Sequence, residues 1–291
     1  MSDSARQKEN VARLRKMTSP CTVCPRRCAV RRDEGELGFC GIGAAPVISS
    51  IAPHFGEERV LVGAGGSGTI FFSGCNLGCV FCQNHDISHE RLGRSVSVEQ
   101  LASGMLELQR AGCANVNFVT PTHMAAPIAA AILQARELGL TIPTVYNTGG
   151  YDSVETLRLL DGLVDIYMPD MKYADAAVAE ELSAARDYPQ VSFAAVQEMH
   201  RQVGDLQVEG GLATRGLLVR HLVLPENLAG SEQIVDFLAA KVSPRTTINV
   251  MGQYRPCYRA EAHARINRLP TREEITTARQ YAIDRGLTVL D

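Results

Sequence analysis

The 291-residue chain has no run of about eighteen apolar residues, so we expect no membrane span. Its first ten residues, MSDSARQKEN, are polar and lack the apolar segment of a signal peptide. A net charge of −3 gives no general reason to expect a membrane surface or nucleic acid as partner. These absences predict a cytoplasmic protein. Because that compartment keeps thiols reduced, the nine cysteines favour metal binding over disulfides.

Strand-like and helix-like segments alternate from about residue 68 onward. Six segments have strand character, and they begin near residues 68, 115, 142, 164, 216 and 247. Helical periodicity fills most of the intervals, as in residues 97–112 and 124–139. Repeated units of this kind predict an α/β fold with a parallel sheet and outer helices. Six strands fit a partial (β/α)6 barrel over residues 68–291 better than a closed eight-stranded one.

The first 67 residues differ in character from the rest. Residues 19–67 contain four cysteines, many glycines and no long periodic element, so we interpret them as a small cysteine-rich, metal-binding appendage. Residues 1–18 are polar and rich in basic side chains. We expect them to be a disordered, solvated arm, and a docking surface for a partner is the alternative.

Polar side chains follow most of the predicted strands. They occur at Cys75, 120–123, 147–150, 170–172 and 253–255. In parallel α/β folds, ligands bind at the carboxyl ends of the strands. The sequence therefore predicts one site at that edge of the sheet.

The stretch SGCNLGCVFCQN places Cys75, Cys79 and Cys82 in a C-x3-C-x2-C pattern directly after the first predicted strand. Zinc prefers four thiolate or imidazole ligands, and His85 or His89 could complete such a site. Three cysteines on one tight loop fit one face of a [4Fe–4S] cluster better. One iron would then have no protein ligand and could bind a substrate or cofactor.

This pattern after the first strand of a partial barrel resembles the radical S-adenosylmethionine (SAM) superfamily, in which the open iron binds the amino and carboxylate groups of SAM. Further stretches resemble the pyruvate formate-lyase activating enzyme branch of uncharacterised homologues. They are NTGG (147–150), MPDMK (168–172) and VRHLVLP (219–225). By position, the resemblance implies that SAM contacts Thr120, Asn147, Thr148, Met168, Asp170 and Arg220. Asn147 replaces the aspartate of that branch, which puts its bound monovalent cation in doubt.

A second group, Cys21, Cys24, Cys28 and Cys40, has the pattern C-x2-C-x3-C-x11-C. Four cysteines can ligate a metal completely, and both zinc and a second iron–sulfur cluster remain open. Cys257 follows the last strand of the predicted barrel. We consider it a candidate hydrogen-atom donor, and an ordinary packed cysteine is the alternative.

The resemblance implies an oxidoreductase that cleaves SAM reductively to a 5′-deoxyadenosyl radical, which takes hydrogen from a substrate. It also implies an electron donor such as flavodoxin or ferredoxin. The first substrate hypothesis is activation of a glycyl radical enzyme. The second is modification of a small molecule, a peptide or RNA. The rival interpretation is a non-enzymatic iron–sulfur or zinc protein that transfers electrons or acts as a scaffold.

Overall fold

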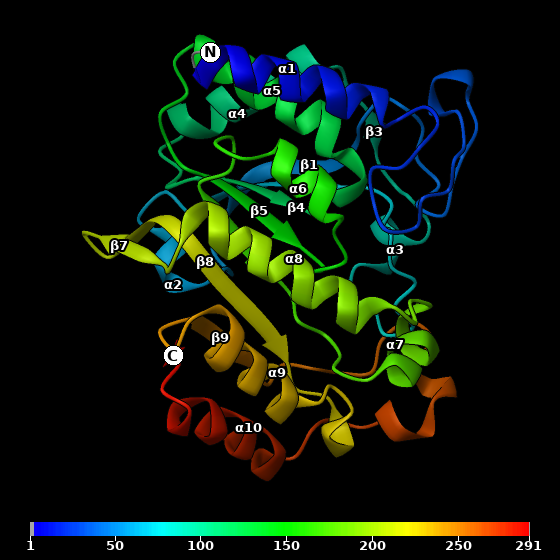
Figure 1. The fold of residues 1–291 in the computed structure, drawn as a ribbon, viewed down its shortest axis with the longest axis vertical. Coiled ribbons are helices and arrows are strands. Elements are labelled where there is room, and N and C mark those ends of the chain that lie inside the picture. The colour runs from blue at the N-terminus through cyan, green and yellow to red at the C-terminus, as the bar shows by residue number, and fades with distance from the viewer. Residues whose placement is uncertain (1–2, 291) are drawn as a thin grey trace.

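The computed structural model describes residues 3–290 and contains one sheet of ten strands with helices packed against it (Figure 1). Nine strands follow the order β10-β9-β8-β6-β5-β4-β2-β1-β3, and β7 pairs with β8 alone. Their bounds are β1 Val47–His54, β2 Ser67–Phe72, β3 Arg94–Ser95, β4 Val116–Val119, β5 Thr144–Thr148, β6 Ile166–Pro169, β7 Gln207–Glu209, β8 Leu212–Leu222, β9 Thr247–Met251 and β10 Thr288–Val289.

The predicted α/β fold with a parallel sheet is confirmed. Every neighbouring pair from β2 through β4, β5, β6, β8 and β9 to β10 is parallel. All six strands predicted from the sequence are present. Strands β2, β5 and β6 are short and almost wholly buried, as expected where helices cover a parallel sheet.

The longer helices follow the strands and cover the sheet. Ten helices have the bounds α1 Asp3–Lys16, α2 Arg59–Val62, α3 His85–Ser88, α4 Val98–Arg110, α5 Ala125–Glu137, α6 Val154–Leu159, α7 Ala176–Ser183, α8 Tyr188–Val203, α9 Ser231–Phe237 and α10 Arg272–Asp284. Helix α10 begins with a capping box: Thr271 Oγ1 accepts from the Glu274 backbone N–H, and the Glu274 side chain accepts from the Thr271 backbone N–H.

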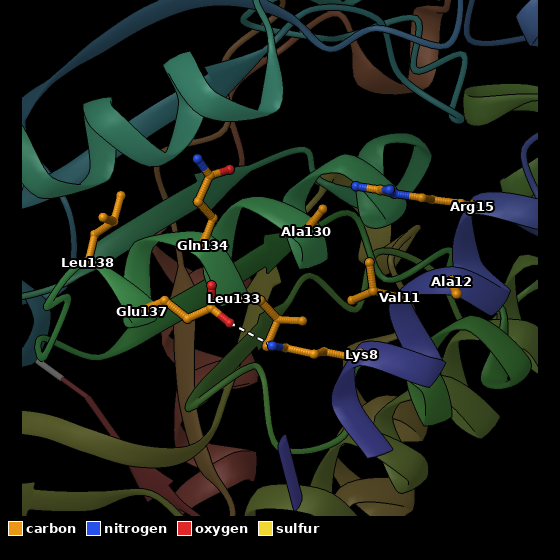
Figure 2. A pocket seen from close by; sticks show the side chains of 9 residues that line it. All are labelled: Lys8, Val11, Ala12, Arg15, Ala130, Leu133, Gln134, Glu137 and Leu138. Carbon is orange, nitrogen blue, oxygen red and sulfur yellow. Dashed lines mark ion pairs between the residues drawn. The ribbon is translucent and has the colours of Figure 1, made fainter. Parts of the chain in front are cut away.

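Residues 3–16 form the helix α1, so the expectation of a disordered arm was wrong for these residues. Val11 and Leu14 are buried in the main core, and α1 packs against α5 and α6. Lys8 Nζ lies 2.9 Å from Glu137 Oε1 across an open groove of about 660 Å³ between α1 and α5 (Figure 2). Two apolar side chains one turn apart provide the anchor, which the many basic residues obscure in the sequence.

The segment 19–67 also contains regular structure that the sequence interpretation missed. Strand β1 pairs antiparallel with β2 and adds an edge to the sheet, and α2 contacts β8. Cys21, Val23 and Ile42 belong to the same hydrophobic core as the barrel strands. The cysteine-rich part of this segment therefore packs directly on the barrel. Among residues 3–290, no helix is both long and apolar enough to span a bilayer.

Candidate active site

One cavity of about 430 Å³ opens at the carboxyl edge of the parallel strands. Its wall is formed by the loop after β2 and by residues at the ends of β4, β5, β6, β8 and β9. Residues proposed from the sequence that line it are Cys75, Cys79, Cys82, Thr120, Asn147, Thr148, Asp170 and Arg220. The expected convergence of strand ends on one site is thus present in the fold.

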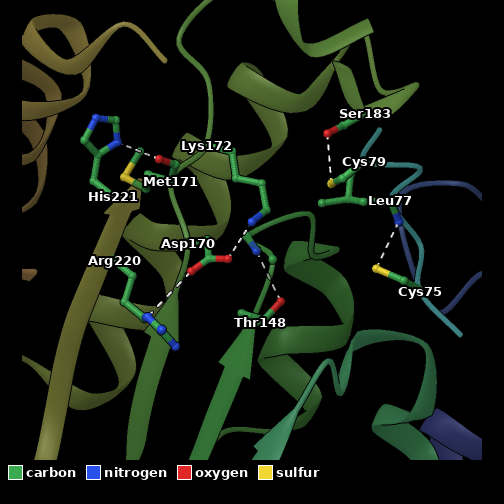
Figure 3. A network of polar contacts seen from close by, with 12 residues as sticks. Cys75, Leu77, Cys79, Thr148, Asp170, Met171, Lys172, Ser183, Arg220 and His221 are labelled. Carbon is green, nitrogen blue, oxygen red and sulfur yellow. Dashed lines mark hydrogen bonds and ion pairs between the residues drawn. The ribbon is translucent and has the colours of Figure 1, made fainter. Parts of the chain in front are cut away.

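The three cysteines of the loop 75–82 line this cavity, and each sulfur has a polar contact; Figure 3 shows those of Cys75 and Cys79. The Leu77 backbone N–H donates to Cys75 Sγ at 3.4 Å, and Ser183 Oγ donates to Cys79 Sγ at 3.0 Å. The sulfur of Cys82 is 3.1 Å from Ser88 Oγ. Hydrogen bonds to ligand sulfurs help set the reduction potential of an iron–sulfur cluster.

Burial raises the pKa values of the Cys75 and Cys79 thiols, so these groups favour their protonated form when no metal is bound. A cysteine thiol loses its proton when it binds a metal, and the metal–sulfur bond offsets the free-energy cost of ionising the buried group. The Lys172 ammonium lies close to this group. Burial alone would lower the Lys172 pKa, but Asp170 and the Cys79 sulfur raise it overall. Lys172 therefore places a fixed positive charge beside the cysteine loop.

The ends of β5 and β6 are held together by Tyr188 of α8. The Lys172 backbone N–H donates to Tyr188 Oη at 3.0 Å. The hydroxyl itself lies 2.8 Å from the carbonyl oxygens of Gly149 and Asp170. Gly150 has φ +77°, and a Cβ there would lie 2.1 Å from the Asp170 carbonyl oxygen, so the turn requires glycine.

Below this turn, a buried carboxylate fixes the end of β5. Asp152 accepts hydrogen bonds from Thr148 Oγ1 at 2.6 Å and from Thr122 Oγ1 at 2.8 Å. Burial raises the pKa of Asp152 to about 6, although these hydroxyls favour its ionised form. The result is a rigid backbone at Asn147 and Thr148, both of which face the cavity.

Arg220 forms the third part of the wall together with two acids that the sequence analysis did not select. Its guanidinium lies 3.6 Å from Glu57 Oε2 and 3.3 Å from Glu58 Oε1. Asp170 Oδ1 is 3.9 Å from Arg220 Nε, while its other oxygen is 2.6 Å from Lys172 Nζ (Figure 3). Burial, partly opposed by Arg220, raises the pKa of Glu57.

Several polar atoms at this wall fit a site whose ligand completes their bonding. Within residues 3–290, Arg220 Nε, Glu57 Oε2 and Glu58 Oε2 are buried without a hydrogen-bond partner, despite the ion pairs. Thr120 adopts φ +61° at the end of β4, a left-handed conformation uncommon outside glycine. Unpaired buried polar groups and backbone strain both concentrate at binding sites. Together with the thiols, they fit a cluster and a charged, polar cofactor such as SAM.

Two residues proposed from the sequence do not reach this cavity. Met168 is fully buried in β6 and packs in a separate small core, so the wall there is made by Asp170 instead. Cys257 lies after β9 but is not among the lining residues, whereas Gln253 is. The chain turns away from the cavity between these two positions. In this structure Cys257, the proposed hydrogen-atom donor, does not line the cavity.

The second cysteine group lines a separate, small, enclosed cavity next to the first site. Cys21, Cys24, Cys28 and Cys40 all face it, and His123 is also part of its wall. Burial, reinforced by the neighbouring thiols, raises the pKa of Cys24 to about 12. Over residues 3–290, no three His, Cys, Asp or Glu side chains converge as ligands of a single metal ion, and this holds for both cysteine groups.

His123, which follows β4, lies between the two cavities rather than at the first one. Its Nε2 is 2.8 Å from the Ser73 carbonyl oxygen, two residues before Cys75. Burial lowers the pKa of His123 to about 4, so the ring is neutral at physiological pH.

The sequence analysis missed several contributors to the site: Glu57, Glu58, Tyr188, Ser183 and Ser88. One local signal could have drawn attention to Glu57: it forms an adjacent pair of acids with Glu58, just before an apolar turn. The hydroxyl contacts join segments far apart in the chain and leave no periodic pattern.

Comparison with known proteins identifies the family of the chain. The radical SAM superfamily domain matches residues 69–238. The chain is 37% identical over 273 residues to "Uncharacterized protein MJ0674" of Methanocaldococcus jannaschii, covering 90% of this chain and 74% of that protein.

Two solved structures are more distant. A radical SAM methyltransferase from Sphaerobacter thermophilus gives a TM-score of 0.49 at 16% identity, over 76% of this chain and 65% of that one. The structure of Streptococcus suis SuiB bound to precursor peptide SuiA gives a TM-score of 0.48 at 14% sequence identity. The match covers 74% of this chain and 46% of that one. The chain thus spans less than two thirds of either solved structure. Because the domain match covers more than half of the residues, the chain belongs to the radical SAM superfamily.

Proposed function

We propose that this protein is a radical enzyme that binds SAM in the strand-end cavity, against a [4Fe–4S] cluster held by Cys75, Cys79 and Cys82. One observation carries the proposal: the same cavity is lined by all three cysteines and by strand-end residues that match SAM-binding positions of the family. When bound, these groups supply reductive cleavage of SAM and removal of a hydrogen atom from a substrate. The residues of the chain position both groups and exclude water.

Each polar group of the wall has a task in this proposal. Arg220 has a donor without a hydrogen-bond partner and binds the carboxylate of SAM. Asp170 and the backbone of the turn 147–150 hold its amino group and ribose. Lys172 compensates the negative charge of the cluster and its thiolates. Because Asp170 is already paired with Lys172 and position 147 is an amide, the proposal includes no monovalent cation.

Glycyl radical activation is the first substrate class to test, and it depends on the resemblance of residues 147–150, 168–172 and 219–225 to activating enzymes. We place the protein in the cytoplasm because all nine cysteines are unpaired thiols. The resemblance to activating enzymes implies flavodoxin or ferredoxin as the electron donor. Electron paramagnetic resonance of proteins captured anaerobically would reveal a glycyl radical. Modification of a captured peptide or RNA instead would replace this substrate class.

The central test measures SAM cleavage. Protein with its full iron–sulfur content is reduced with dithionite under anaerobic conditions, SAM is added, and 5′-deoxyadenosine is quantified. We expect product from the wild type and none from Cys79→Ala. Cys113→Ala is the matched control, since Cys113 is also buried, lies in the main hydrophobic core and is not among the residues that line the cavity.

If the loaded wild type forms no product, a SAM titration on the same sample decides the matter. Binding that is weakened by Arg220→Met would support the site and indicate that cleavage requires the substrate. Absence of binding to a protein with a complete cluster would refute the proposal. The non-enzymatic alternative predicts that second result.

A further inference from the structure

The cysteine group near the N-terminus stands outside the cavity used for SAM. We propose that Cys21, Cys24, Cys28 and Cys40 bind a second iron–sulfur cluster, fully ligated by protein, that directly adjoins the loop of the first. This inference does not depend on the substrate of the enzyme or on SAM cleavage.

The four thiols are gathered around one enclosed space rather than dispersed in the core. Cys21 and Cys24 are each 7% exposed, and apolar groups such as Val23 and Val30 line part of the cavity. All four are unpaired thiols. Four thiols around one small cavity, two of them buried and two partly exposed, form a complete ligand set for a thiophilic metal centre.

A buried positive charge faces the same space without an anionic partner. Arg32 is 3% exposed and lines the cavity. Its guanidinium donates only to carbonyl oxygens, to Gly43 at 2.6 Å and to His123 at 2.8 Å, and forms no ion pair within residues 3–290. An isolated buried guanidinium is costly. A metal centre with four thiolates is anionic and would supply the missing countercharge.

The backbone around Cys28 is arranged for a sulfur ligand. The Phe39 N–H donates to Cys28 Sγ at 3.4 Å, the same contact that Leu77 makes with Cys75 in the first loop. A Cβ on Gly38 would lie 2.8 Å from that sulfur, so only glycine permits the approach. Arg27 and Ala29 on either side of Cys28 have φ +42° and +55°. Such strain persists where the surrounding structure, or a ligand, enforces it.

Four thiolates can ligate either a zinc ion or an iron–sulfur cluster. The position of this group favours the cluster, because it directly adjoins the loop 75–82. There a second cluster can exchange an electron with the first, whereas zinc has no redox chemistry.

Direct contacts join the two cysteine segments. Arg26, between Cys24 and Cys28, donates its Nε–H to the Asn76 carbonyl oxygen at 2.9 Å. A Cβ on Gly74 would lie 2.6 Å from the Cys40 carbonyl oxygen, which shows how closely these backbones approach. A cluster with every iron ligated by protein cannot bind SAM. Placed here, it is suited to one-electron transfer with the first cluster.

Anaerobic native mass spectrometry of the full chain tests the proposal without any substitution. We expect a mass increment of two iron–sulfur clusters per chain. In the variant with Cys75→Ala, Cys79→Ala and Cys82→Ala, one cluster should remain. In Cys24→Ala with Cys28→Ala, the cluster at the loop should remain alone. Cys113→Ala is the control and should retain both.

Proximity has its own readout. When both clusters are reduced, electron paramagnetic resonance should show signals broadened by their magnetic interaction, and removing either cysteine group should abolish the broadening. One zinc ion and a single cluster in the wild type would overturn the proposal, as would a metal-free second group. Neither result would affect the SAM titration, so the two proposals fail separately.

Discussion

Replacing Tyr188 by phenylalanine should weaken SAM binding even though the hydroxyl is not part of the cavity wall. The substitution keeps the ring, which is fully buried, and removes only the hydroxyl. That hydroxyl accepts from Lys172 N–H and lies within hydrogen-bond distance of the Gly149 and Asp170 carbonyl oxygens. Its loss leaves two or three buried backbone groups unpaired where β5 and β6 end.

The size of the effect follows from those unpaired groups. Each costs about 1–3 kcal/mol, so we expect the free energy of unfolding to fall by about 3 kcal/mol. The unpaired groups should also make the turn 147–150 and the position of Asp170 less ordered. If this weakens the binding free energy of SAM by about 1.4 kcal/mol, the Kd for SAM rises about tenfold. Denaturant unfolding and a SAM titration of the cluster-loaded protein measure the two quantities.

Tyr167→Phe is the matched control. Tyr167 is equally buried, and its hydroxyl lies 2.8 Å from Gln202 Oε1 in the main core, away from the cavity. This variant should lose stability and keep the wild-type Kd for SAM. If Tyr188→Phe loses stability but binds SAM as tightly as the wild type, the coupling between the two strand ends that we describe is wrong.

Three further predictions concern the same wall. Because the pKa of Asp152 is about 6 in the fold against 3.8 for the model compound, ionising it costs about 3 kcal/mol. Stability of the wild type relative to Asp152→Asn should therefore fall as pH rises from about 4 through 6, and a difference in melting temperature that stays constant from pH 5 to 8 would contradict this. Gly150→Ala forces a Cβ to 2.1 Å from the Asp170 carbonyl oxygen and should abolish SAM binding in the titration, whereas Gly43→Ala, with open space around it, should not. Arg220→Met leaves two buried glutamates without their cation; we expect a loss of about 3 kcal/mol in denaturant unfolding and weaker SAM binding, and an unchanged Kd would exclude the proposed carboxylate contact.

Local patterns in the sequence determined a large part of this protein. The spacing of Cys75, Cys79 and Cys82 specifies a three-ligand loop, because neighbouring residues of a short segment stay neighbours in any fold. The six apolar, strand-like runs predicted the parallel strands, since burial on both faces leaves a continuous hydrophobic signature. Topology then requires strand ends to meet, so eight residues that line the cavity could be named in advance.

Other features were decided only by the tertiary structure. Helix α1 buries two apolar side chains, Val11 and Leu14. Two are too few for composition alone to distinguish this helix from a solvated arm. Glu57 and Tyr188 enter the site through pairings with residues distant in sequence, and such contacts carry no periodicity. The sequence could not show that Met168 and Cys257 lie outside the cavity lining, because the direction of a side chain depends on backbone twist and on packing.

The adjacency of the two cysteine groups has the same origin. The sequence predicted two sets of metal ligands, because spacing along a loop determines which thiols can share a metal centre. It could not specify that Arg26 would reach Asn76, or that the Cys40 backbone would pack on Gly74. Those contacts arise from burying the segment 19–67 against the barrel, which brings distant parts of the chain together only once the whole core has formed.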